Sequence, residues 1–544
     1  MSSKHWQASY GTVPTEINPD AYASVTLMMD EAMQRFADKP AFRCAGQTLS
    51  YAQIDKLSRD FAAYLQNKLG VKKGDRIAVM TPNLLAFPIA FLGIVRAGAA
   101  QVNVNPLYTP HELQHQLNDA GAEIIVVFSA VSGTVAEVMA KTGLKTVITH
   151  GVGDGSGKAL PSPPVDARLA GATSLASALA EGAALPLAPV ATNGGDLLFL
   201  QYTGGTTGLS KGAALSHRNL VANVEQYKAF MPPEMTVPGQ VIVTAIPLYH
   251  VFALMVNFIT FFTLGADNWL VPNPRDFDAF IDTLKAARPN VFMGVNTLYA
   301  GLVAHPRSKE VDWSRLKLAG GGGAAVIAAV SHRWKAMTGV IIHEGYGLSE
   351  TSPVVSFNPL WVTEFSSTTG LPLPSTDVKL LDEDGKEVAL GEAGEIVVKG
   401  PQVMSGYWQR PADNATAFTQ DGYFRTGDVG VFDAKGFLKI VDRKKDMIIV
   451  SGFNVYPNEI EAVASSCPGV AECACVGVSD EKTGEAVKLF VVKLPGAALN
   501  ETELIVHCRK ELTGYKIPRQ VVFVDSLPKS TVGKILRREL RDLK

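Results

Sequence analysis

The stretch DLLFLQYTGGTTGLSKG, residues 196–212, is the part of the sequence that says most about the fold. Residues 196–201 form a short apolar run, which is typical of a buried strand. The loop that follows is rich in glycine, whose lack of a Cβ atom lets backbone N–H groups turn toward an anion. The hydroxyl groups of its threonines and the ammonium group of Lys211 would add donors and a compensating charge. The segment therefore predicts a strand followed by a phosphate-binding loop.

The composition of this loop is also compatible with a turn that binds nothing. A glycine-rich turn with many hydroxyl groups needs no ligand at all, and this alternative stays open for the loop taken alone. A Walker loop is excluded, because no glycine stands four residues before a Gly-Lys-Ser/Thr triplet. The loop is thus predicted to bind an anion without being a Walker loop.

Outside this loop, the sequence alternates apolar strands with amphipathic helices. Residues 75–80 (DRIAVM) and 122–128 (AEIIVVF) are predicted strands. Residues 26–36, 51–69 and 111–120 have apolar side chains at helical spacing. Such alternation is typical of α/β layers with mainly parallel sheets.

The chain of 544 residues is too long for a single hydrophobic core, so at least two folding units are expected. A charged cluster at residues 441–448 (VDRKKDMI) interrupts strand-like sequence, and a new succession of helices and strands follows it. We therefore predict a large N-terminal domain, residues 1–441, and a small C-terminal α+β domain, residues 442–544. Residues 151–195, rich in Gly, Ala, Pro and Ser, are predicted to form an exposed irregular connection.

Composition and charge exclude several classes of protein. Fifty basic and 52 acidic residues give a formal net charge of -2, so no nucleic acid partner is expected. The five cysteines lack the paired spacing of a zinc or redox site. The first residues lack the pattern of a secretory signal, and the apolar stretch 251–266 is shorter than a membrane span. We therefore expect a cytoplasmic protein in which this stretch is a buried helix.

Six further segments contain residue types suited to nucleotide chemistry, although each would be ordinary packing or solvated surface if taken alone. They are IPLYHVFAL (246–254), LAGGGGAAV (318–326), EGYGLSET (344–351), GYFRTGDVG (422–430), VDRKKDM (441–447) and LPKSTVGKILRREL (527–540). With the loop at 202–212, they resemble in order the motifs of the adenylate-forming superfamily, which comprises acyl-CoA ligases, carrier-protein adenylation domains and luciferases. Further segments, including GPQVMSGYWQRP and SGFNVYPNEIE, most closely resemble bacterial long-chain fatty acid CoA ligases.

This resemblance implies a fold and a motion. The fold class is α/β, with a large N-terminal domain of layered α/β subdomains, an added β-barrel-like part, and a small C-terminal α+β domain joined by a hinge. Asp442 matches the hinge aspartate of the family. The C-terminal domain is expected to be mobile and to carry the catalytic lysine, Lys534.

The resemblance also implies roles around the nucleotide. Tyr346 would stack on adenine, Asp428 would bond both ribose hydroxyls, and Ser349 would touch the α-phosphate. Glu350 would hold Mg²⁺ with help from Thr203, and these two residues form the catalytic set with Lys534. The full set of implied nucleotide contacts is Thr203, Gly204, Gly205, Thr206, Thr207, Lys211, Gly322, Gly323, Glu344, Gly345, Tyr346, Gly347, Ser349, Asp428, Arg443 and Lys534.

At three positions the sequence departs from the commoner forms of these motifs. Ala325 stands where proline is common, Ser349 stands where threonine is commoner, and Arg425 stands where several relatives have histidine. The first departure weakens the contacts assigned to Gly322 and Gly323.

For the acid and for coenzyme A the resemblance implies further contacts. Gly452 is the implied contact of the pantetheine arm of CoA. Plain core packing remains the alternative for the residues implied to wall the acid pocket, which are Tyr249, His250, Phe252, Gly294, Val295 and Tyr299.

The implied function is a long-chain fatty acid:CoA ligase (AMP-forming). ATP and a fatty acid would give an acyl-adenylate and pyrophosphate, and the CoA thiol would then release acyl-CoA and AMP, with ATP, Mg²⁺ and coenzyme A as cofactor and co-substrates. The alternatives are a medium-chain or aryl acid:CoA ligase, and a non-catalytic lipid-binding scaffold on the same fold. Weak peripheral contact with the inner face of the cell membrane is plausible for a fatty acid enzyme, and a homodimer is left open.

Overall fold

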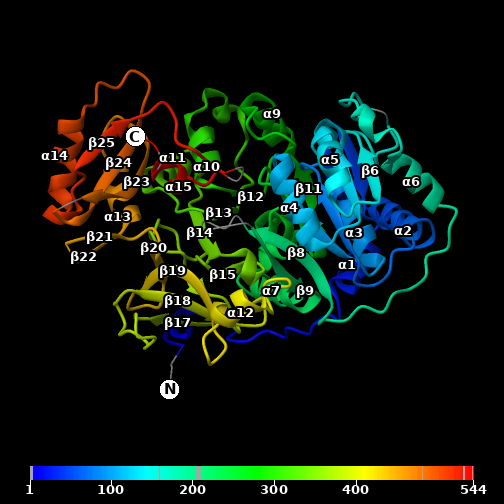
Figure 1. The fold of residues 1–544 in the computed structure, drawn as a ribbon, viewed down its shortest axis with the longest axis horizontal. Coiled ribbons are helices and arrows are strands. Elements are labelled where there is room, and N and C mark those ends of the chain that lie inside the picture. Colours follow the sequence, from blue (N-terminus) through cyan, green and yellow to red (C-terminus); the bar gives the residue numbers. More distant parts are fainter. Residues whose placement is uncertain are drawn as a thin grey trace.

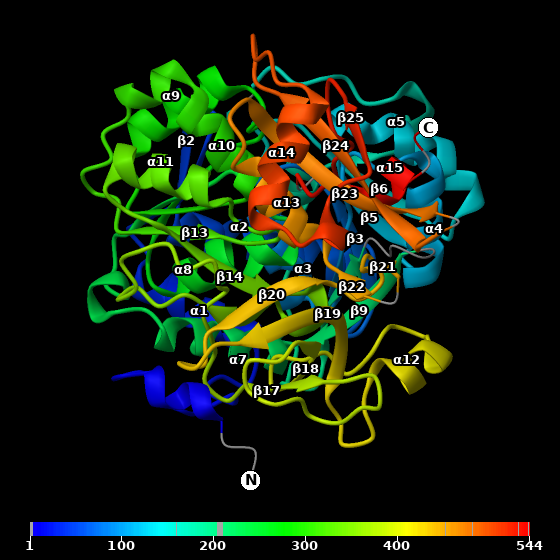
Figure 2. The same cartoon turned by 90° about the vertical axis from the view of Figure 1, so that its left-hand side faces the viewer.

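The computed structural model describes residues 4–158, 160–203, 210–451, 453–480, 482–530, 533–541 and 543. Within these residues the strands form four sheets. Three sheets belong to the large N-terminal part, and the fourth belongs to a smaller C-terminal unit, residues 448–543. This unit lies above the smallest N-terminal sheet in both views (Figure 1, Figure 2). The mixed α/β arrangement, with a large and a small part, confirms the predicted fold class.

The first large sheet has seven strands in the order β7-β6-β5-β3-β4-β8-β9, parallel throughout except for β8 and β9. Parallel neighbours require crossover connections, here mostly helical. The strands are β3 (Arg76–Met80), β4 (Ala100–Asn103), β5 (Ile124–Phe128), β6 (Thr146–His150), β7 (Thr173–Ser174), β8 (Leu197–Thr203) and β9 (Lys211–Ser216). The helices of this layer are α2 (Tyr51–Asn67), α3 (Ala86–Arg96), α4 (Pro110–Ala120), α5 (Ser132–Val138) and α6 (Leu175–Gly182).

The second large sheet has nine strands in the order β16-β15-β14-β13-β12-β10-β11-β1-β2, and the run from β14 to β1 is parallel. Its strands are β1 (Pro40–Cys44), β2 (Gln47–Ser50), β10 (Val241–Thr244), β11 (Asp267–Leu270), β12 (Val291–Gly294), β13 (Leu318–Gly321), β14 (Ile342–Gly347), β15 (Val354–Phe357) and β16 (Leu371–Pro372). Its helices are α1 (Val25–Arg35), α7 (His217–Ala229), α9 (Phe277–Ala287), α10 (Asn296–Ala304) and α11 (Ala328–Thr338).

The two remaining sheets lie toward the C-terminus. A four-stranded antiparallel sheet contains β17 (Asp377–Leu381), β18 (Gly394–Lys399), β19 (Phe424–Phe432) and β20 (Leu438–Arg443). The C-terminal unit contains β21 (Ile448–Val450), β22 (Phe453–Val455), β23 (Val470–Asp480), β24 (Gly484–Lys493) and β25 (Gln520–Phe523), with α13 (Pro457–Ser465), α14 (Glu501–Glu511) and α15 (Arg537–Arg541).

Local signals explain why most predicted elements were found. Ser50 and Thr109 begin α2 and α4 with complete capping boxes, in which Gln53 and Glu112 bond back to the cap. The predicted helices at 26–36, 51–69 and 111–120 are confirmed by α1, α2 and α4. The predicted strands at 75–80, 122–128 and 196–201 are confirmed by β3, β5 and β8.

The prediction for residues 151–195 was wrong in part, because this segment contains β7 and α6. Ser174 caps α6 by accepting a hydrogen bond from the Ser177 backbone. Leu175, Ala178 and Leu179 are buried on the face of α6 toward α2. The helix α6 was not predicted because its buried face has only a few apolar side chains, so its helical periodicity is weak among many small residues.

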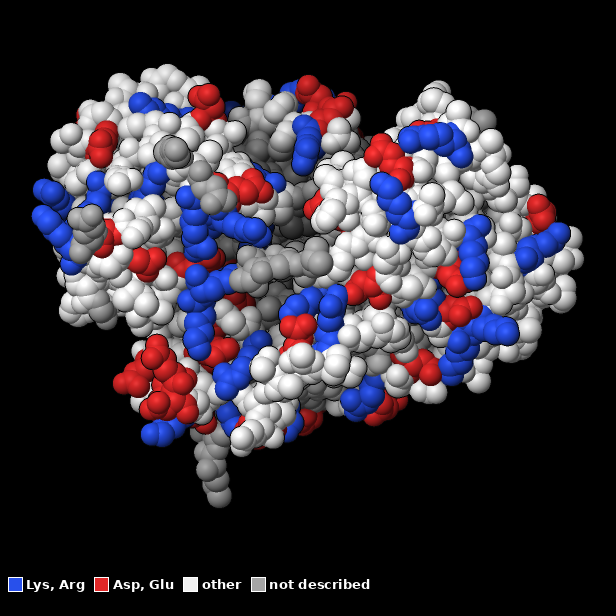
Figure 3. Space-filling model, in the orientation of Figure 1, with Lys and Arg blue, Asp and Glu red and all other residues white. Residues whose placement is uncertain are grey.

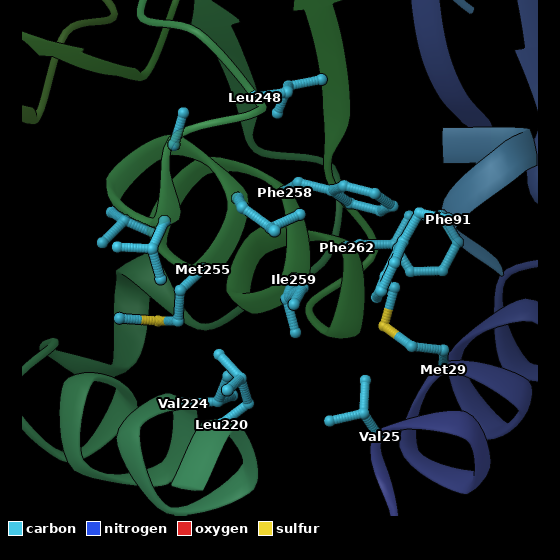
Figure 4. Close-up of a cluster of buried hydrophobic side chains, with 14 of the residues drawn as sticks. Val25, Met29, Phe91, Leu220, Val224, Leu248, Met255, Phe258, Ile259 and Phe262 are labelled. Atoms are coloured by element: carbon cyan, nitrogen blue, oxygen red, sulfur yellow. The ribbon is translucent and has the colours of Figure 1, made fainter. Parts of the chain in front are cut away.

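The apolar stretch predicted to be a buried helix joins the two large layers. It contains a π-helical segment, η6 (Ala253–Thr260), followed by α8 (Phe261–Thr263), and nearly all of its side chains are buried. The centre of the Phe258 ring lies 5.5 Å from that of Phe91 on α3 (Figure 4). It also lies 4.9 Å from the centre of the Phe42 ring on β1. Among the described residues, no helix is both long and apolar enough to cross a bilayer.

Replacement of Phe258 by alanine should lower the free energy of unfolding by about 3–5 kcal/mol, because it leaves a cavity where α3, β1 and η6 meet. The exposed Leu27, whose side chain is 52% accessible, provides a matched control. Leu27→Ala should change that free energy by less than about 0.5 kcal/mol. Urea unfolding followed by tryptophan fluorescence measures both changes, and equal losses in the two variants would refute this account of the core.

Candidate active site

The described ends of the predicted phosphate loop belong to the antiparallel strands β8 and β9. Thr203 ends β8 and pairs in register with Lys211, the first residue of β9. The Lys211 ammonium forms an ion pair with Asp413 and lies 5.4 Å from the centre of the Tyr407 ring. Four predicted phosphate contacts of this loop lie outside the described residues: Gly204, Gly205, Thr206 and Thr207.

Glu350 lies beside these strands, because β8 and β9 both pack against the short helix η8 (Ser349–Thr351). Its side chain is buried, and its Oε1 accepts a hydrogen bond of 2.8 Å from the Tyr407 hydroxyl. Its backbone carbonyl accepts a hydrogen bond of 2.8 Å from the Met404 N–H. Burial raises the pKa of the Glu350 carboxyl, and the hydrogen bond from Tyr407 opposes that rise. Ser349, half-buried, begins the same helix.

A tyrosine, a carboxylate and a guanidinium from three strands converge near this point. The Tyr346 hydroxyl donates a hydrogen bond of 2.7 Å to Oδ2 of Asp428. The Arg443 Nε atom lies 3.2 Å from Oδ1 of the same carboxylate, across the β19–β20 ladder. Burial and the Asp428 charge raise the pKa of Tyr346, so its hydroxyl remains a donor. Three predicted nucleotide contacts are thus brought together.

The glycine-rich loop after β13 lies against β14 and against Phe252. A Cβ atom at Gly322 would lie 3.3 Å from the Gly345 carbonyl oxygen and 3.5 Å from the Phe252 ring. Gly323 has φ of +77°, a left-handed conformation that favours glycine. A Cβ atom at Gly347 would lie 2.0 Å from the Pro353 carbonyl oxygen, so this position accepts only glycine without a backbone shift.

Glu344 lies behind this loop as a buried carboxyl group. Its Oε1 accepts a hydrogen bond of 3.2 Å from the Val326 N–H, and its own carbonyl accepts one of 3.1 Å from the Asn358 side chain. Burial raises the pKa of Glu344 to about 8, so the group is mostly protonated at neutral pH. It therefore orders the glycine loop without adding a full negative charge.

Two buried amides hold the start of residues 245–252, here called the acid segment, which follows β10. The Asn83 side chain donates to the carbonyl oxygens of Thr244 and Ile246, each at 3.0 Å, and accepts from the Leu248 N–H at 2.8 Å. The Gln201 side chain donates to the Tyr249 carbonyl oxygen at 3.2 Å. Both amides come from the other large layer, so this segment is fixed between the two sheets.

The remaining acid-pocket residues occupy two different environments. Val295 lies beside the glycine loop, since a Cβ atom at Gly323 would be 3.8 Å from its side chain. Tyr299 is fully buried, with its hydroxyl 3.0 Å from the Phe292 carbonyl oxygen and its ring edge-on to Trp334. Gly294 is covered by the Tyr299 ring, 3.0 Å from a Cβ atom built there. Val295 therefore lies near the other predicted site residues. Tyr299 instead supports β12, through its hydrogen bond to Phe292.

Lys534 reaches this region from the C-terminal unit. The preceding residue, Gly533, approaches α10 so closely that a Cβ atom there would lie 2.5 Å from Oγ1 of Thr297. Burial lowers the pKa of Lys534 to about 8, repulsion by Arg443 adds to that effect, and attraction by Asp428 opposes it. Burial and the Lys534 charge also lower the pKa of His250 to about 4, so this imidazole is neutral at pH 7.

The acid segment, Val295 and the glycine loop follow the carboxyl ends of three neighbouring parallel strands. Strands β10, β12 and β13 end at Thr244, Gly294 and Gly321. The acid segment, Val295 and the glycine loop come next in the chain, at the edge where open α/β sheets bind ligands. Figure 3 shows a hollow near the middle of this face of the molecule, with Lys and Arg side chains on its rim.

Comparison with known proteins identifies the family of this chain. Residues 29–408 match the family described as AMP-binding enzyme, and residues 459–534 match its C-terminal domain. The chain belongs to the AMP-binding enzyme family. A long-chain fatty acid–CoA ligase from Salmonella typhimurium is 50% identical over 99% of this chain and 98% of its own length. One from Escherichia coli O157:H7 is 49% identical with the same coverage.

A solved structure has the same fold. The crystal structure of ATP-bound MatB from Rhodopseudomonas palustris superposes with a TM-score of 0.84. It is 33% identical to this AMP-binding enzyme, and the match covers 95% of this chain and 98% of that one.

Asp442, the predicted hinge residue, is buried where β20 ends. Its Oδ2 accepts a hydrogen bond of 2.7 Å from the Asn458 N–H, and its Oδ1 accepts one of 3.1 Å from Arg537. Burial raises the pKa of Asp442 to about 6, although the Arg537 charge opposes that rise. Arg537 also forms an ion pair of 2.9 Å with Glu461. The predicted CoA contact Gly452 lies outside the described residues.

Sequence reasoning missed Tyr407, Asp413 and Arg537. Tyr407 and Arg537 lie in segments that carry the resemblance, GPQVMSGYWQRP and LPKSTVGKILRREL, and Asp413 lies two residues after the first. A tyrosine or an arginine at such a position has no distinctive local pattern. Their partners lie 57 residues away for Tyr407 and 95 for Arg537, so no short-range signal identifies them.

Arg537→Met should loosen the C-terminal unit of this AMP-binding enzyme, because it leaves the carboxylates of Asp442 and Glu461 without their buried partner. A loss of about 3 kcal/mol in local stability would raise the rate of proteolytic cleavage there about a hundredfold. The control is Arg519→Met, since Arg519 is half exposed and forms an ion pair only with Asp480 among the described residues. Limited proteolysis with fragment mapping measures both rates, and equal cleavage of the two variants would contradict the expectation.

Proposed function

We propose that this AMP-binding enzyme is a long-chain fatty acid:CoA ligase (AMP-forming). The observation that carries the proposal is the position of Lys534, whose ammonium interacts electrostatically with the Asp428–Arg443 pair and with His250. A cation at this point can act on the α-phosphate of a nucleotide and on a carboxylate together. The identity of about half of all residues to ligases of this name, over nearly the whole chain, supports the same function.

The chemistry explains why two steps are needed. A carboxylate is a poor acyl donor, because its leaving group would be oxide. In the first step a carboxylate oxygen attacks the α-phosphorus of ATP, and pyrophosphate leaves. In the second step the CoA sulfur attacks the acyl carbon, and AMP leaves with the electrons of the mixed-anhydride bond. No protein nucleophile is required, so the five buried cysteines have no role in this reaction.

In the proposed complex the chain provides a separate contact for each part of the nucleotide. The adenine lies against Tyr346 and the flat main chain at Gly322 and Gly323. The Asp428 carboxylate accepts hydrogen bonds from the ribose hydroxyls, and Arg443 holds that carboxylate in place. Each contact uses a group that is already fixed by another part of the protein, which reduces the cost of ordering on binding.

Lysine and hydroxyl side chains are proposed to bind the phosphates of ATP. Lys211 and the threonines of the loop, beginning with Thr203, bind the phosphate chain, and Ser349 donates to the α-phosphate. Lys534 offsets the charge that develops as the α-phosphorus is attacked. This ammonium is withdrawn when the C-terminal domain rotates about Asp442 for the second step, with residues 1–441 and 442–544 as the proposed domains.

The donors near the loop suit Mg²⁺. Glu350 offers a buried carboxylate, and Thr203 offers a hydroxyl at the end of the adjoining strand. No group of three or more His, Cys, Asp or Glu side chains in the described ranges could hold a metal by itself. Mg²⁺ suits such a site because it keeps waters and takes substrate phosphates as ligands. When bound, the ion would neutralise phosphate charge.

The acid is proposed to enter beside Tyr249, His250, Phe252 and Val295, with its tail among apolar side chains of η6. Burial of each methylene contributes about 0.8 kcal/mol, so a dozen contribute on the order of 10 kcal/mol of gross attraction. Discrimination by one methylene is only about 1–3 kcal/mol, which predicts a broad chain-length profile. Long-chain acids also partition into bilayers, so weak peripheral membrane contact is part of the proposal, and Gly452 is the proposed pantetheine contact.

Incubation with Mg-ATP, CoA and palmitate should yield AMP, pyrophosphate and palmitoyl-CoA in equal amounts. Lys534→Ala should reduce pyrophosphate release by at least about a hundredfold, because a positioned charge on the reacting phosphate is lost. Octanoate and benzoate serve as alternative acids. Turnover with these acids but not with palmitate would move the assignment to a medium-chain or aryl acid ligase, and no pyrophosphate with any acid would favour a binding protein.

Pyrophosphate release measured without CoA should decline above pH 8. The cause is deprotonation of Lys534, whose pKa is lowered from 10.5 to about 8 in the docked conformation. The docked state favours the neutral amine, so docking of the C-terminal unit becomes more stable as the pH rises from about 8 toward 10.5. The decline in pyrophosphate release therefore reflects the lost charge of Lys534 and not undocking of this unit.

The control for this pH profile is Lys534→Arg. Arginine stays charged over this range, so the decline above pH 8 should disappear even if the overall rate is lower. The same alkaline limb in the pyrophosphate-release profiles of both enzymes would assign the limb to another group.

A further inference from the structure

Residues 404–414 (MSGYWQRPADN), here called the bridging segment, connect β9 to Glu350. The Ala214 N–H donates to the Gly406 carbonyl oxygen at 3.0 Å, and the Trp408 N–H donates to that of Gly212 at 2.8 Å. The segment thus runs along β9, immediately after Lys211. At its other end the Met404 N–H donates to the Glu350 carbonyl oxygen.

Tyr407 is held rigidly in this segment. Its N–H donates to Oδ1 of Asn414 at 2.7 Å, and the Asn414 amide donates back to the Tyr407 carbonyl oxygen at 2.9 Å. Two hydrogen bonds to one side chain close this turn on itself. The Tyr407 ring therefore projects from a fixed backbone.

From that position the Tyr407 side chain contacts both charged groups of the phosphate site. Its hydroxyl donates to Oε1 of Glu350 at 2.8 Å. Its ring centre lies 5.4 Å from Nζ of Lys211, within the range of a cation–π interaction. On its other side the Lys211 ammonium is held by Asp413, from the same bridging segment.

These contacts have different physical consequences. A hydrogen bond to an ionised carboxylate is strong and directional, so the hydroxyl fixes which way the Glu350 oxygens point. The ring attracts the ammonium without neutralising it, so Lys211 keeps its charge for an incoming phosphate. The Tyr407 side chain therefore aligns the Glu350 carboxyl group and the Lys211 ammonium, which the proposed reaction uses together.

We propose that Tyr407 is a positioning residue that orients the Glu350 carboxylate and the Lys211 ammonium to receive magnesium-bound ATP. This inference rests on the proposed function only in its choice of ligand. Tyr407 itself touches neither the substrate nor the reacting atoms. It acts through Glu350 by its hydroxyl and through Lys211 by its ring.

The chain offers a closely matched control residue. Tyr423 also donates its hydroxyl to a carboxylate, Asp377 at 2.8 Å, and also has a lysine over its ring, Lys379 at 4.1 Å. Its partners Asp377 and Lys379 belong to β17, the edge strand of the four-stranded sheet. Tyr423→Phe therefore removes the same kind of hydrogen bond without touching the phosphate site.

The experiment is equilibrium binding of ATP by calorimetry, once with excess Mg²⁺ and once with EDTA. Tyr407→Phe keeps the ring and loses the hydroxyl, so the dissociation constant for Mg-ATP should rise about tenfold, equivalent to about 1.4 kcal/mol. Binding in EDTA should stay at the wild-type value, because the ring still faces Lys211. Tyr423→Phe should match wild type in both conditions.

A double mutant tests the route of action. In a Glu350→Gln background, Tyr407→Phe should have no further effect on Mg-ATP affinity, since the two residues act as one unit. Equal weakening with Mg²⁺ and with EDTA would indicate a merely structural role and overturn the proposal, as would wild-type affinity in Tyr407→Phe. If Tyr407→Phe fails to fold while Tyr423→Phe folds, the role is structural and the proposal is likewise rejected.

Failure of the proposed function would look different. Wild-type protein that binds ATP in a Mg²⁺-dependent manner but releases pyrophosphate with no acid would refute the ligase assignment. The binding comparison of Tyr407→Phe with Tyr423→Phe would still decide the inference about Tyr407.

Discussion

The site depends on holding one ammonium group, that of Lys534, away from bulk water and beside another cation, Arg443. Burial and repulsion together lower its pKa to about 8, and the charge of Asp428 offsets part of that cost. The arrangement can exist only while the C-terminal unit is docked, because Lys534 and Asp428 belong to different parts of the chain. Docking in turn needs the close approach at Gly533, where any side chain would collide with Thr297.

Three buried carboxyl groups, those of Glu344, Asp442 and Glu350, show how local partners set different properties. Glu344 meets the Val326 backbone and is mostly neutral, which suits a group that orders a loop beside an uncharged base. Asp442 is matched by Arg537 at the end of β20, where the two parts of the chain join. Glu350 accepts a hydrogen bond from a tyrosine hydroxyl, which fixes its orientation and opposes the rise in its pKa. Burial raises the pKa of each group, and the partner decides what the group can do.

The scaffold matters because it fixes the acid segment from both sides. Asn83 and Gln201 come from the seven-stranded layer, yet they bond the backbone between Thr244 and Tyr249 in the nine-stranded layer. Below this segment, η6 fills the space between the layers with apolar side chains. A displacement of one layer relative to the other would leave buried amides and carbonyls unpaired, so the two layers hold the acid segment in a single position.

The amino-acid sequence by itself determined the α/β class, most helices and strands, and the family, because period, capping and contiguous motifs are local properties of the chain. It also predicted which residues would form the site. The fold brings Tyr346, Asp428, Arg443 and Lys534 together, and the role of each stays a prediction. The helix α6 was missed because its stability comes from contact with α2 rather than from its own composition. The supporting partners Tyr407, Asp413, Arg537 and Asn83 were decided only by the tertiary structure. Their hydrogen bonds and ion pairs join residues far apart in sequence, and only the packed layers bring such groups within bonding distance.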